Sequence, residues 1–152
     1  MPHIHEKIDF TVAAYIVNSE KVLLINHRQL KKWLPIGGHI ELDEDSDEAL
    51  FREIEEESGL KKEELGVASV KPEVISEGTK FLYTPNYLDI HDITEEHRHI
   101  GMIYFLKSTT NKVTLAEREH SEIKWFSKID LEDKKFNLSP AIKLYAIEAL
   151  KT

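Results

Sequence analysis

The 152-residue sequence contains no cysteine. The chain therefore forms no disulfide and offers no zinc–thiolate site or thiol nucleophile. This composition is compatible with a reducing compartment, and we expect a cytoplasmic protein. Long hydrophobic runs are also missing, since no apolar run approaches the length that spans a bilayer. The first ten residues carry Glu6 and Asp9 where a secretory signal has a basic segment, so neither secretion nor membrane insertion is expected.

Positive charge is in deficit as well. The sequence has 20 Lys and Arg against 28 Asp and Glu, a formal net charge of -8. Proteins that hold extended nucleic acids usually carry a basic footprint, so this balance argues against such a partner. It leaves small nucleotides open, because metal ions can supply the missing positive charge. The length and the 41% hydrophobic content predict one folded domain over residues 1–152.

Short apolar runs predict strands before and after one well-defined helix. The first two runs are separated by Asn18-Ser19-Glu20 and read as a hairpin. The predicted strands are Phe10–Val17, Lys21–Ile25, Val74–Ser76, Phe81–Tyr83, Tyr87–Ile90, Ile100–Leu106 and Ile123–Phe126. A turn or short helix is expected over Lys128–Asp133, and a last helix starts at Ser139 or Pro140. This order of elements predicts an α/β fold with a mixed sheet covered by helices.

The strongest local signals predict a helix over Ser46–Ser58. Asp45 is a capping residue, and Glu48 follows three positions later to complete a capping box. Leu50 and Ile54 lie four residues apart and give the helix one apolar flank. Gly59 stands where a helix ends in left-handed geometry.

Three glutamates share another face of this helix. Glu53, Glu56 and Glu57 are separated by three and four residues, which places their side chains together. Such a cluster repels itself unless a cation sits between its members, and hard oxygen ligands suit Mg²⁺ or Mn²⁺. A solvated acidic face is the alternative. Glu55 points to a different side and is expected to be solvated.

The residues around this helix resemble the Nudix box. The box reads Gly, five residues, Glu, seven residues, then Arg-Glu-apolar-any-Glu-Glu-any-Gly-apolar. Its specified positions are filled by Gly38, Glu44, Arg52, Glu53, Ile54, Glu56, Glu57, Gly59 and Leu60. The flanks agree more loosely, at Pro35–Gly38 and at Glu122–Phe126. Several residue types at fixed spacing make the resemblance highly specific.

The resemblance implies a Nudix hydrolase with an α/β/α sandwich fold. Such enzymes hydrolyse a nucleoside diphosphate linked to another moiety and need a divalent cation, usually Mg²⁺ or Mn²⁺. Carried over residue by residue, it implies that Glu53, Glu56 and Glu57 bind metal, with the backbone carbonyl of Gly37 or Gly38 as a further ligand. We expect a nucleoside triphosphate or a similarly small derivative as substrate, and a homodimer is compatible with the family.

Hydrolysis also needs a base to take a proton from the attacking water. Within the box, Glu53 and Glu56 are candidates. In some members of the family a glutamate from a later loop serves instead, and here Glu119 is our choice. Glu117 and His120 are close alternatives in the same loop.

Two arginines are assigned supporting roles. Arg52 is expected to pair with a nearby carboxylate, such as Glu44, and to fix its position. Arg28 follows the second predicted strand, where it could contact a substrate phosphate or base.

Three histidines, His91, His97 and His99, gather around one predicted strand. A zinc site would need a better-defined third ligand at suitable spacing. We therefore favour structural or pocket-lining roles for them over metal binding.

Other functions remain as alternatives. A non-catalytic nucleotide-sensing module of the same fold usually has lost box carboxylates, which this chain keeps. An isomerase of the isopentenyl diphosphate type normally asks for a catalytic cysteine, and an mRNA-decapping enzyme needs a basic tract to hold the RNA. The sequence has neither feature.

Overall fold

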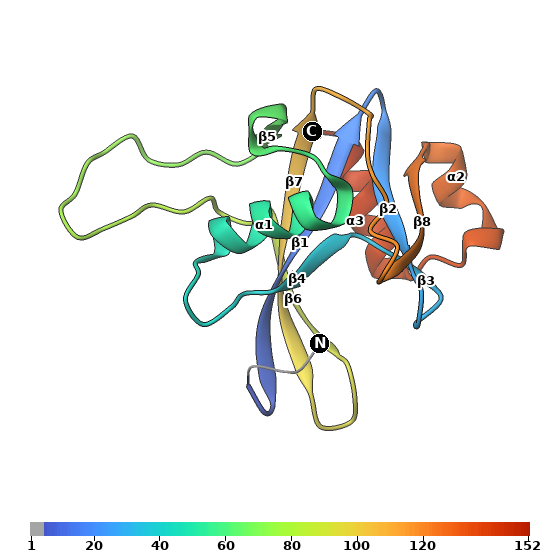
Figure 1. The fold of residues 1–152 in the computed structure, drawn as a ribbon, viewed down its shortest axis with the longest axis horizontal. Helices are drawn as coiled ribbons and strands as arrows, with labels where there is room; N and C mark the ends of the chain where they lie inside the picture. Colours follow the sequence, from blue (N-terminus) through green and yellow to red (C-terminus); the bar gives the residue numbers. More distant parts are fainter. Residues whose placement is uncertain (1–4) are drawn as a thin grey trace.

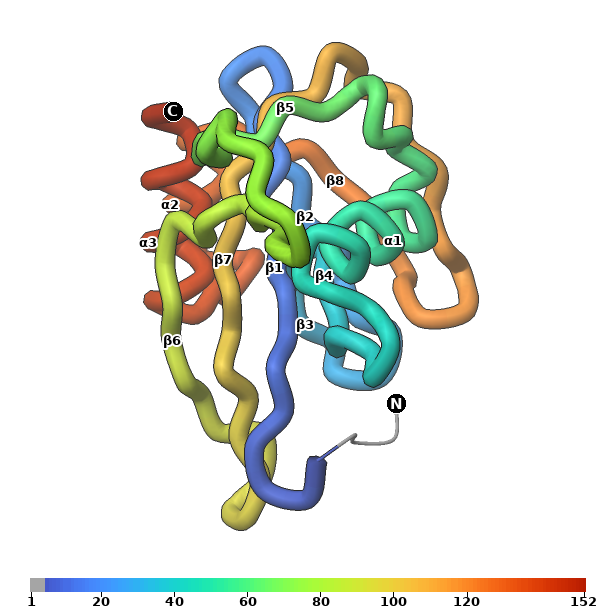
Figure 2. Tube along the Cα trace, turned by 90° about the vertical axis from the view of Figure 1, so that its left-hand side faces the viewer, coloured from blue at the N-terminus to red at the C-terminus, as the bar shows by residue number. Residues whose placement is uncertain are grey.

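The computed structural model describes residues 5–152 and consists of an eight-stranded mixed sheet between helices (Figure 1). Helix α1 covers one face, and α3 covers the other (Figure 2). This arrangement confirms the α/β/α sandwich expected from the sequence. The strands are β1 (Ile8–Asn18), β2 (Lys21–His27), β3 (Lys32–Leu34), β4 (Ile36–His39), β5 (Leu65–Val67), β6 (Tyr87–Asp92), β7 (Arg98–Ser108) and β8 (His120–Phe126). The helices are α1 (Ser46–Ser58), α2 (Lys128–Glu132) and α3 (Pro140–Leu150), with 3₁₀ turns η1 (Lys62–Glu64) and η2 (Lys134–Phe136).

Strand β1 organises the sheet. It runs parallel to β7 along its length, with Ile8 opposite Arg98 and Val17 opposite Lys107. On its other edge, its first half pairs antiparallel with β4 and its end pairs with β2. Strand β2 in turn carries β3 and β8, which confirms the predicted hairpin and extends it.

Side chains of β1 alternate between two apolar cores, because successive residues of a strand point to opposite faces. Val12, Ala14 and Ile16 pack with Leu50 and Ile54 of α1. Tyr15 and Val17 belong to the core on the opposite face, which includes Tyr145 and Ala146 of α3. The even-numbered residues of β1 thus define the α1 face of the sheet, and the odd-numbered residues define the α3 face.

Helix α1 has the predicted bounds, and both of its ends carry the expected caps. The Asp45 carboxylate accepts a hydrogen bond from Glu48 N at 2.9 Å, and Glu48 Oε1 accepts one from Asp45 N at 3.0 Å. Gly59 ends the helix with a φ of 77°, where its missing Cβ removes the steric cost of left-handed geometry. The capping signals therefore located this helix correctly.

Two predicted strands are wrong. Val74–Ser76 and Phe81–Tyr83 belong to a long loop between β5 and β6, which extends from the body of the molecule (Figure 1). Within this loop the only strand-like pairing is a bridge between Ser76 and Thr79. The backbone N–H of Tyr83 donates to the side chain of Asp47 at 3.1 Å. The apolar pattern is present, but the loop has no neighbouring strand to complete a ladder.

Within residues 5–152, no helix has both the length and the apolar character to cross a bilayer.

The cap of α1 gives a stability prediction. We expect Asp45→Ala to lower the free energy of unfolding by about 1 kcal/mol at neutral pH, the usual effect of removing an N-cap. Chemical denaturation measures the change. Asp43→Ala is the matched control, because Asp43 is exposed and lies two residues earlier in the same loop. Equal destabilisation by both substitutions would contradict the assignment.

The same cap predicts a pH dependence. Partial burial acts to raise the pKa of Asp45, but hydrogen bonds from Lys80 and from the Glu48 backbone outweigh it and lower this pKa from 3.8 to about 2. The stabilisation by ionised Asp45 is therefore complete above about pH 4 and is lost as the pH falls toward 2. The stability difference between the parent and Asp45→Ala should shrink over that range.

Candidate catalytic and metal site

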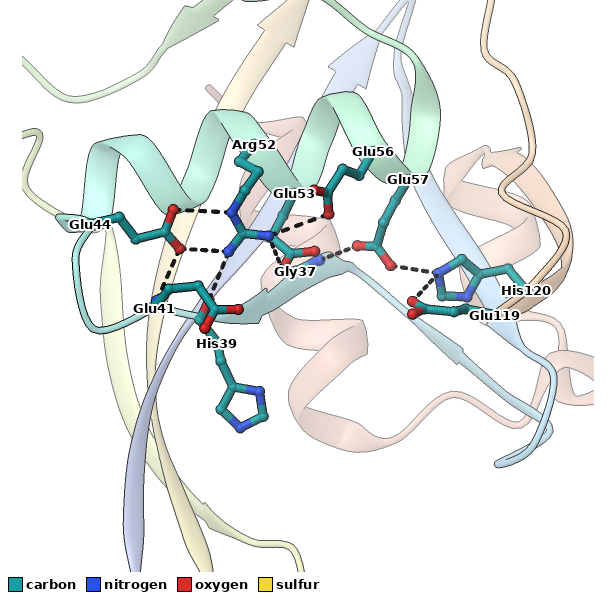
Figure 3. Close-up of polar contacts among 10 residues, drawn as sticks. All are labelled: Gly37, His39, Glu41, Glu44, Arg52, Glu53, Glu56, Glu57, Glu119 and His120. Carbon is teal, nitrogen blue, oxygen red and sulfur yellow. Dashed lines mark hydrogen bonds and ion pairs between the residues drawn. The ribbon is translucent and has the colours of Figure 1, made fainter. Parts of the chain in front are cut away.

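The side chains of Glu53 and Glu57 on α1 lie against the backbone of β4 (Figure 3). Glu53 and Glu57 are buried, at 4% and 5% exposure, whereas Glu56 faces solvent. The Glu53 carboxylate lies directly on Gly38, where an added Cβ would overlap Oε1. Glycine at this position is therefore what lets a helix carboxylate reach the strand.

Glu57 is held from two sides. Its Oε1 accepts a hydrogen bond from Gly37 N at 2.9 Å, and its Oε2 contacts His120 Nε2 at 2.5 Å. In an antiparallel ladder the N–H and C=O of one residue point to the same side of the strand. The Gly37 carbonyl therefore also faces away from β1, on the side where Glu57 lies.

Arg52 links the helix to the loop before it. Its guanidinium donates to both oxygens of Glu44 at 3.0 and 2.5 Å, and to the backbone oxygen of His39 at 3.1 Å. The remaining contacts are to Glu53 at 2.9 Å and to Glu56 at 3.3 Å. Arg52 thus makes a bidentate contact with the Glu44 carboxylate. The hydrogen bonds to Glu44 raise the pKa of Arg52 above its usual value.

The electrostatics of the cluster favour a cation. Burial, followed by repulsion from Glu57, raises the pKa of Glu53 to about 8 even though Arg52 opposes the shift. Burial favours the protonated, neutral form of such a carboxyl group. A positive ion placed beside it would reverse the balance and favour the carboxylate.

The loop before β8 forms the other wall of the site. A cleft of about 570 Å³ is lined by Glu56, Glu57 and residues 116–119. The Glu119 side chain is 63% exposed, and its Oε2 lies 3.9 Å from His120 Nε2. Ligand atoms of Glu57, Glu119 and His120 lie within 4.8 Å of one another. The structure therefore brings Glu119 to the same cleft as Glu56 and Glu57.

Arg28 holds this loop in place. Its Nε and Nη2 donate to the backbone oxygen of Glu117 at 3.1 and 2.8 Å, and Nη2 also reaches that of His120 at 3.2 Å. The Arg28 backbone N–H donates to Glu119 O at 2.8 Å. The observed contacts of Arg28 are thus with the loop, and its contact with a substrate stays a prediction.

His120 is the residue whose importance the sequence understated. The sequence indicates it only as an alternative base, yet its ring is buried at 2% exposure and contacts Glu57 directly. The contact spans 63 positions of sequence and depends on how β8 pairs with β2. Only its place in the same loop as Glu119 hinted at it.

Comparison with solved structures identifies relatives of this fold. A hydrolase of the NUDIX family from Clostridium perfringens is 34% identical and superposes with a TM-score of 0.80, covering 94% of this chain and 96% of that one. The MutT NUDIX hydrolase from Burkholderia pseudomallei is 22% identical, with a TM-score of 0.66 and coverage of 96% and 98%. A C. elegans Ap4A hydrolase is 18% identical, with a TM-score of 0.69 and coverage of 92% and 93%. No match was found among curated proteins.

A family model adds independent evidence. The model of the NUDIX domain matches residues 7–145, which include every element from β1 to most of α3. Together with the 34% identity to the Clostridium perfringens hydrolase, this match shows the family of the chain. The chain belongs to the Nudix family and is a hydrolase of phosphoric anhydride bonds.

Proposed function

We propose that this Nudix hydrolase uses Mg²⁺ or Mn²⁺ to cleave the pyrophosphate linkage of a small nucleotide, with nucleoside triphosphates as the favoured class. The observation that carries the proposal is the burial of Glu53 against Gly38, beside Glu57. A buried carboxyl group stays ionised only where another charge compensates it, and otherwise takes up a proton. The cleft of about 570 Å³ has the volume of a small-ligand site.

The donors in the site fit a hard divalent cation. Glu53, Glu56 and Glu57 would hold it, with the carbonyl of Gly37 as a further oxygen ligand, and oxygen donors are what Mg²⁺ and Mn²⁺ prefer. Burial and repulsion from Glu57 raise the pKa of Glu53 despite its contact with Arg52, which supports a place for a further positive charge beside it. When bound, the cation neutralises phosphate charge and orients the substrate for attack.

The protein side chains have separate tasks in this proposal. Glu119 takes a proton from the attacking water, since it reaches the cleft on an exposed loop. Glu53 and Glu56 are the other candidate bases within the box. Arg52 and Glu44 fix the orientation of Glu53, and Arg28 positions the loop that carries Glu119 and adds a contact to the substrate.

A conservative substitution at the metal site tests the proposal. We expect Glu56→Gln or Glu53→Gln to lower kcat/KM by at least about 100-fold, because even outer-shell partners of a metal contribute about 10–100-fold. Turnover of a panel of nucleoside diphosphate derivatives with Mg²⁺, scored by phosphate and pyrophosphate release, measures the effect. EDTA should abolish the activity and Mn²⁺ should restore it.

Glu55→Gln is the matched control, because Glu55 lies on the same helix but pairs with Lys61 at 2.5 Å. It should leave turnover unchanged. Near-normal rates in both Glu53→Gln and Glu56→Gln would overturn the site assignment. Tight nucleotide binding without turnover of any compound in the panel would favour the sensing module instead.

The two glycines of β4 allow packing and metal binding to be separated. An added Cβ at Gly38 meets the movable Glu53 carboxylate, whereas one at Gly37 meets the backbone oxygen of Val12. We expect Gly38→Ala to weaken Mn²⁺ binding by about tenfold or more, as displaced metal partners do. Gly37→Ala should lower the free energy of unfolding by more than about 1 kcal/mol, as overpacking does. Calorimetric Mn²⁺ titration and thermal unfolding distinguish the two outcomes, and an unchanged Mn²⁺ affinity in Gly38→Ala would refute the first.

The base can be identified by three parallel substitutions in one loop. Glu119→Gln should lower kcat by about 10²–10⁴-fold, the contribution of a positioned base, without changing Mn²⁺ affinity. Glu117→Gln should have a much smaller effect. His120→Gln should weaken Mn²⁺ binding, because His120 orients Glu57. A larger kcat loss in Glu117→Gln than in Glu119→Gln would transfer the role to Glu117.

A further inference from the structure

A second group of side chains that could bind a metal lies at the end of the sheet where β1 begins. It consists of Asp9, His39, His97 and His99, which we name the imidazole cluster. The strand register explains how it forms: Asp9 of β1 lies opposite His99 of β7, and His39 of β4 lies opposite Thr11, two residues along β1 from Asp9. Side chains in register share one face of a sheet. Asp9 and His39 come from β1 and β4, which are far from His97 and His99 in the sequence. Sequence spacing alone therefore does not place these four residues together.

The members of the cluster are close enough to share an ion. Asp9 Oδ2 lies 3.1 Å from His39 Nε2 and 3.2 Å from His97 Nε2. Ligand atoms of Asp9, His39 and His99 all lie within 4.8 Å of one another. Two ligand atoms on a tetrahedral zinc are about 3.3 Å apart, since each is about 2.0–2.1 Å from the metal. Small side-chain rotations are therefore enough to close the group around an ion.

This cluster is distinct from the acidic site. Asp9 and Thr11 belong to the α3 face of the sheet, like Tyr15, whereas Glu53 packs on the α1 face. Figure 3 shows the His39 ring pointing away from the glutamates of α1. Asp9, His39 and His97 are buried, at 1%, 7% and 4% exposure, whereas His99 is only half-buried at the edge of the cluster.

We propose that Asp9, His39 and His99 form a binding site for a first-row transition-metal cation, with zinc as the favoured ion, and that His97 positions Asp9. Imidazole nitrogens suit zinc, whereas Mg²⁺ demands oxygen ligands. Two histidines and one carboxylate leave a fourth position for water or for His97. The proposal does not depend on the hydrolytic function, because it uses none of the box carboxylates.

The surroundings support ligation by neutral imidazoles. The His99 ring packs edge-on against the rings of His39 and His97, with centroids 4.9 and 5.2 Å away. Neutral imidazole is the form that binds metals. His97 Nδ1 lies 2.9 Å from the carbonyl oxygen of Glu6, which only accepts, so Nδ1 carries a proton. Such a contact fixes the ring that in turn contacts Asp9, as outer-shell partners do in metal sites.

The metal would act as a clamp between strands. Its ligands come from β1, β4 and β7, which the clamp would join at the end where α3 no longer covers the sheet (Figure 2). His39 also ends β4, and its backbone oxygen accepts from Arg52. Occupancy would therefore stiffen the strand end at which the Nudix box begins.

Zinc titration by calorimetry tests this proposal, with His120→Gln as the parent protein. That background removes the only histidine of the other candidate group, formed by Glu57, Glu119 and His120. We expect one zinc to bind in the presence of excess Mg²⁺. Adding His99→Gln should weaken this binding by at least about 100-fold, since even outer-shell partners contribute about 10–100-fold. Adding His91→Gln is the matched control and should leave the affinity unchanged, because His91 lies beside His99 but pairs with Asp89.

Two-dimensional ¹H–¹⁵N spectra of the imidazole rings give an independent readout on the same parent without any change to the cluster. Zinc should shift the ring nitrogens of His39 and His99 and leave those of His27 in place. Unmoved His39 and His99 signals at saturating zinc would overturn the proposal, as would tight binding that survives His99→Gln. If His99→Gln fails to fold, His39→Gln and the ring spectra decide. Zinc binding needs no turnover, so its failure and the failure of the hydrolytic proposal are separately visible.

Discussion

The close approach of helix α1 to Gly38 of strand β4 is the contact on which the acidic site depends. An added Cβ at Gly37 would overlap the backbone oxygen of Val12, and one at Gly38 would overlap the Glu53 carboxylate. Gly38 thus makes room for the helix carboxylate, and Gly37 makes room for the backbone of β1. The consequence is electrostatic, because Glu53 and Glu57 lose water when they approach the strand. Desolvation raises the pKa of Glu53 and makes a nearby cation favourable, so packing sets up the chemistry.

Local signals and long-range partners explain which parts of the fold could be predicted from the sequence. Helix α1 was located correctly because its caps are encoded within a few residues of its ends, at Asp45 and Gly59. The hairpin of β1 and β2 also depends on neighbouring residues. Val74–Ser76 has a strand-like composition but no strand beside it, and its apolar Ile75 is fully exposed. A strand exists only where a partner supplies hydrogen bonds, and the composition of one segment cannot show where that partner lies.

The same distinction holds for the site. The spacing of Glu53, Glu56 and Glu57 is a local property of one helix and could be read directly. The contact between His120 and Glu57 joins residues 63 positions apart and depends on the register of β8. The guanidinium of Arg28 lies on the backbone of the loop that carries Glu119, a contact that the sequence does not indicate, and its contact with a substrate stays a prediction. Sequence spacing therefore predicts the acidic residues of α1. Their partners, such as His120, are brought to them only by the pairing of distant strands.

Strand β4 connects the two candidate cation sites because its residues alternate between the faces of the sheet. Gly38 faces the carboxylates of α1, and the side chain of His39 belongs to the imidazole cluster. The ligand chemistry keeps the two sites apart in what they would bind, since one offers oxygen and the other mostly nitrogen. Their mechanical connection is direct, because the His39 backbone oxygen accepts from the same Arg52 that contacts Glu53 and Glu56. Any change that shifts His39 therefore reaches the acidic site through one guanidinium group.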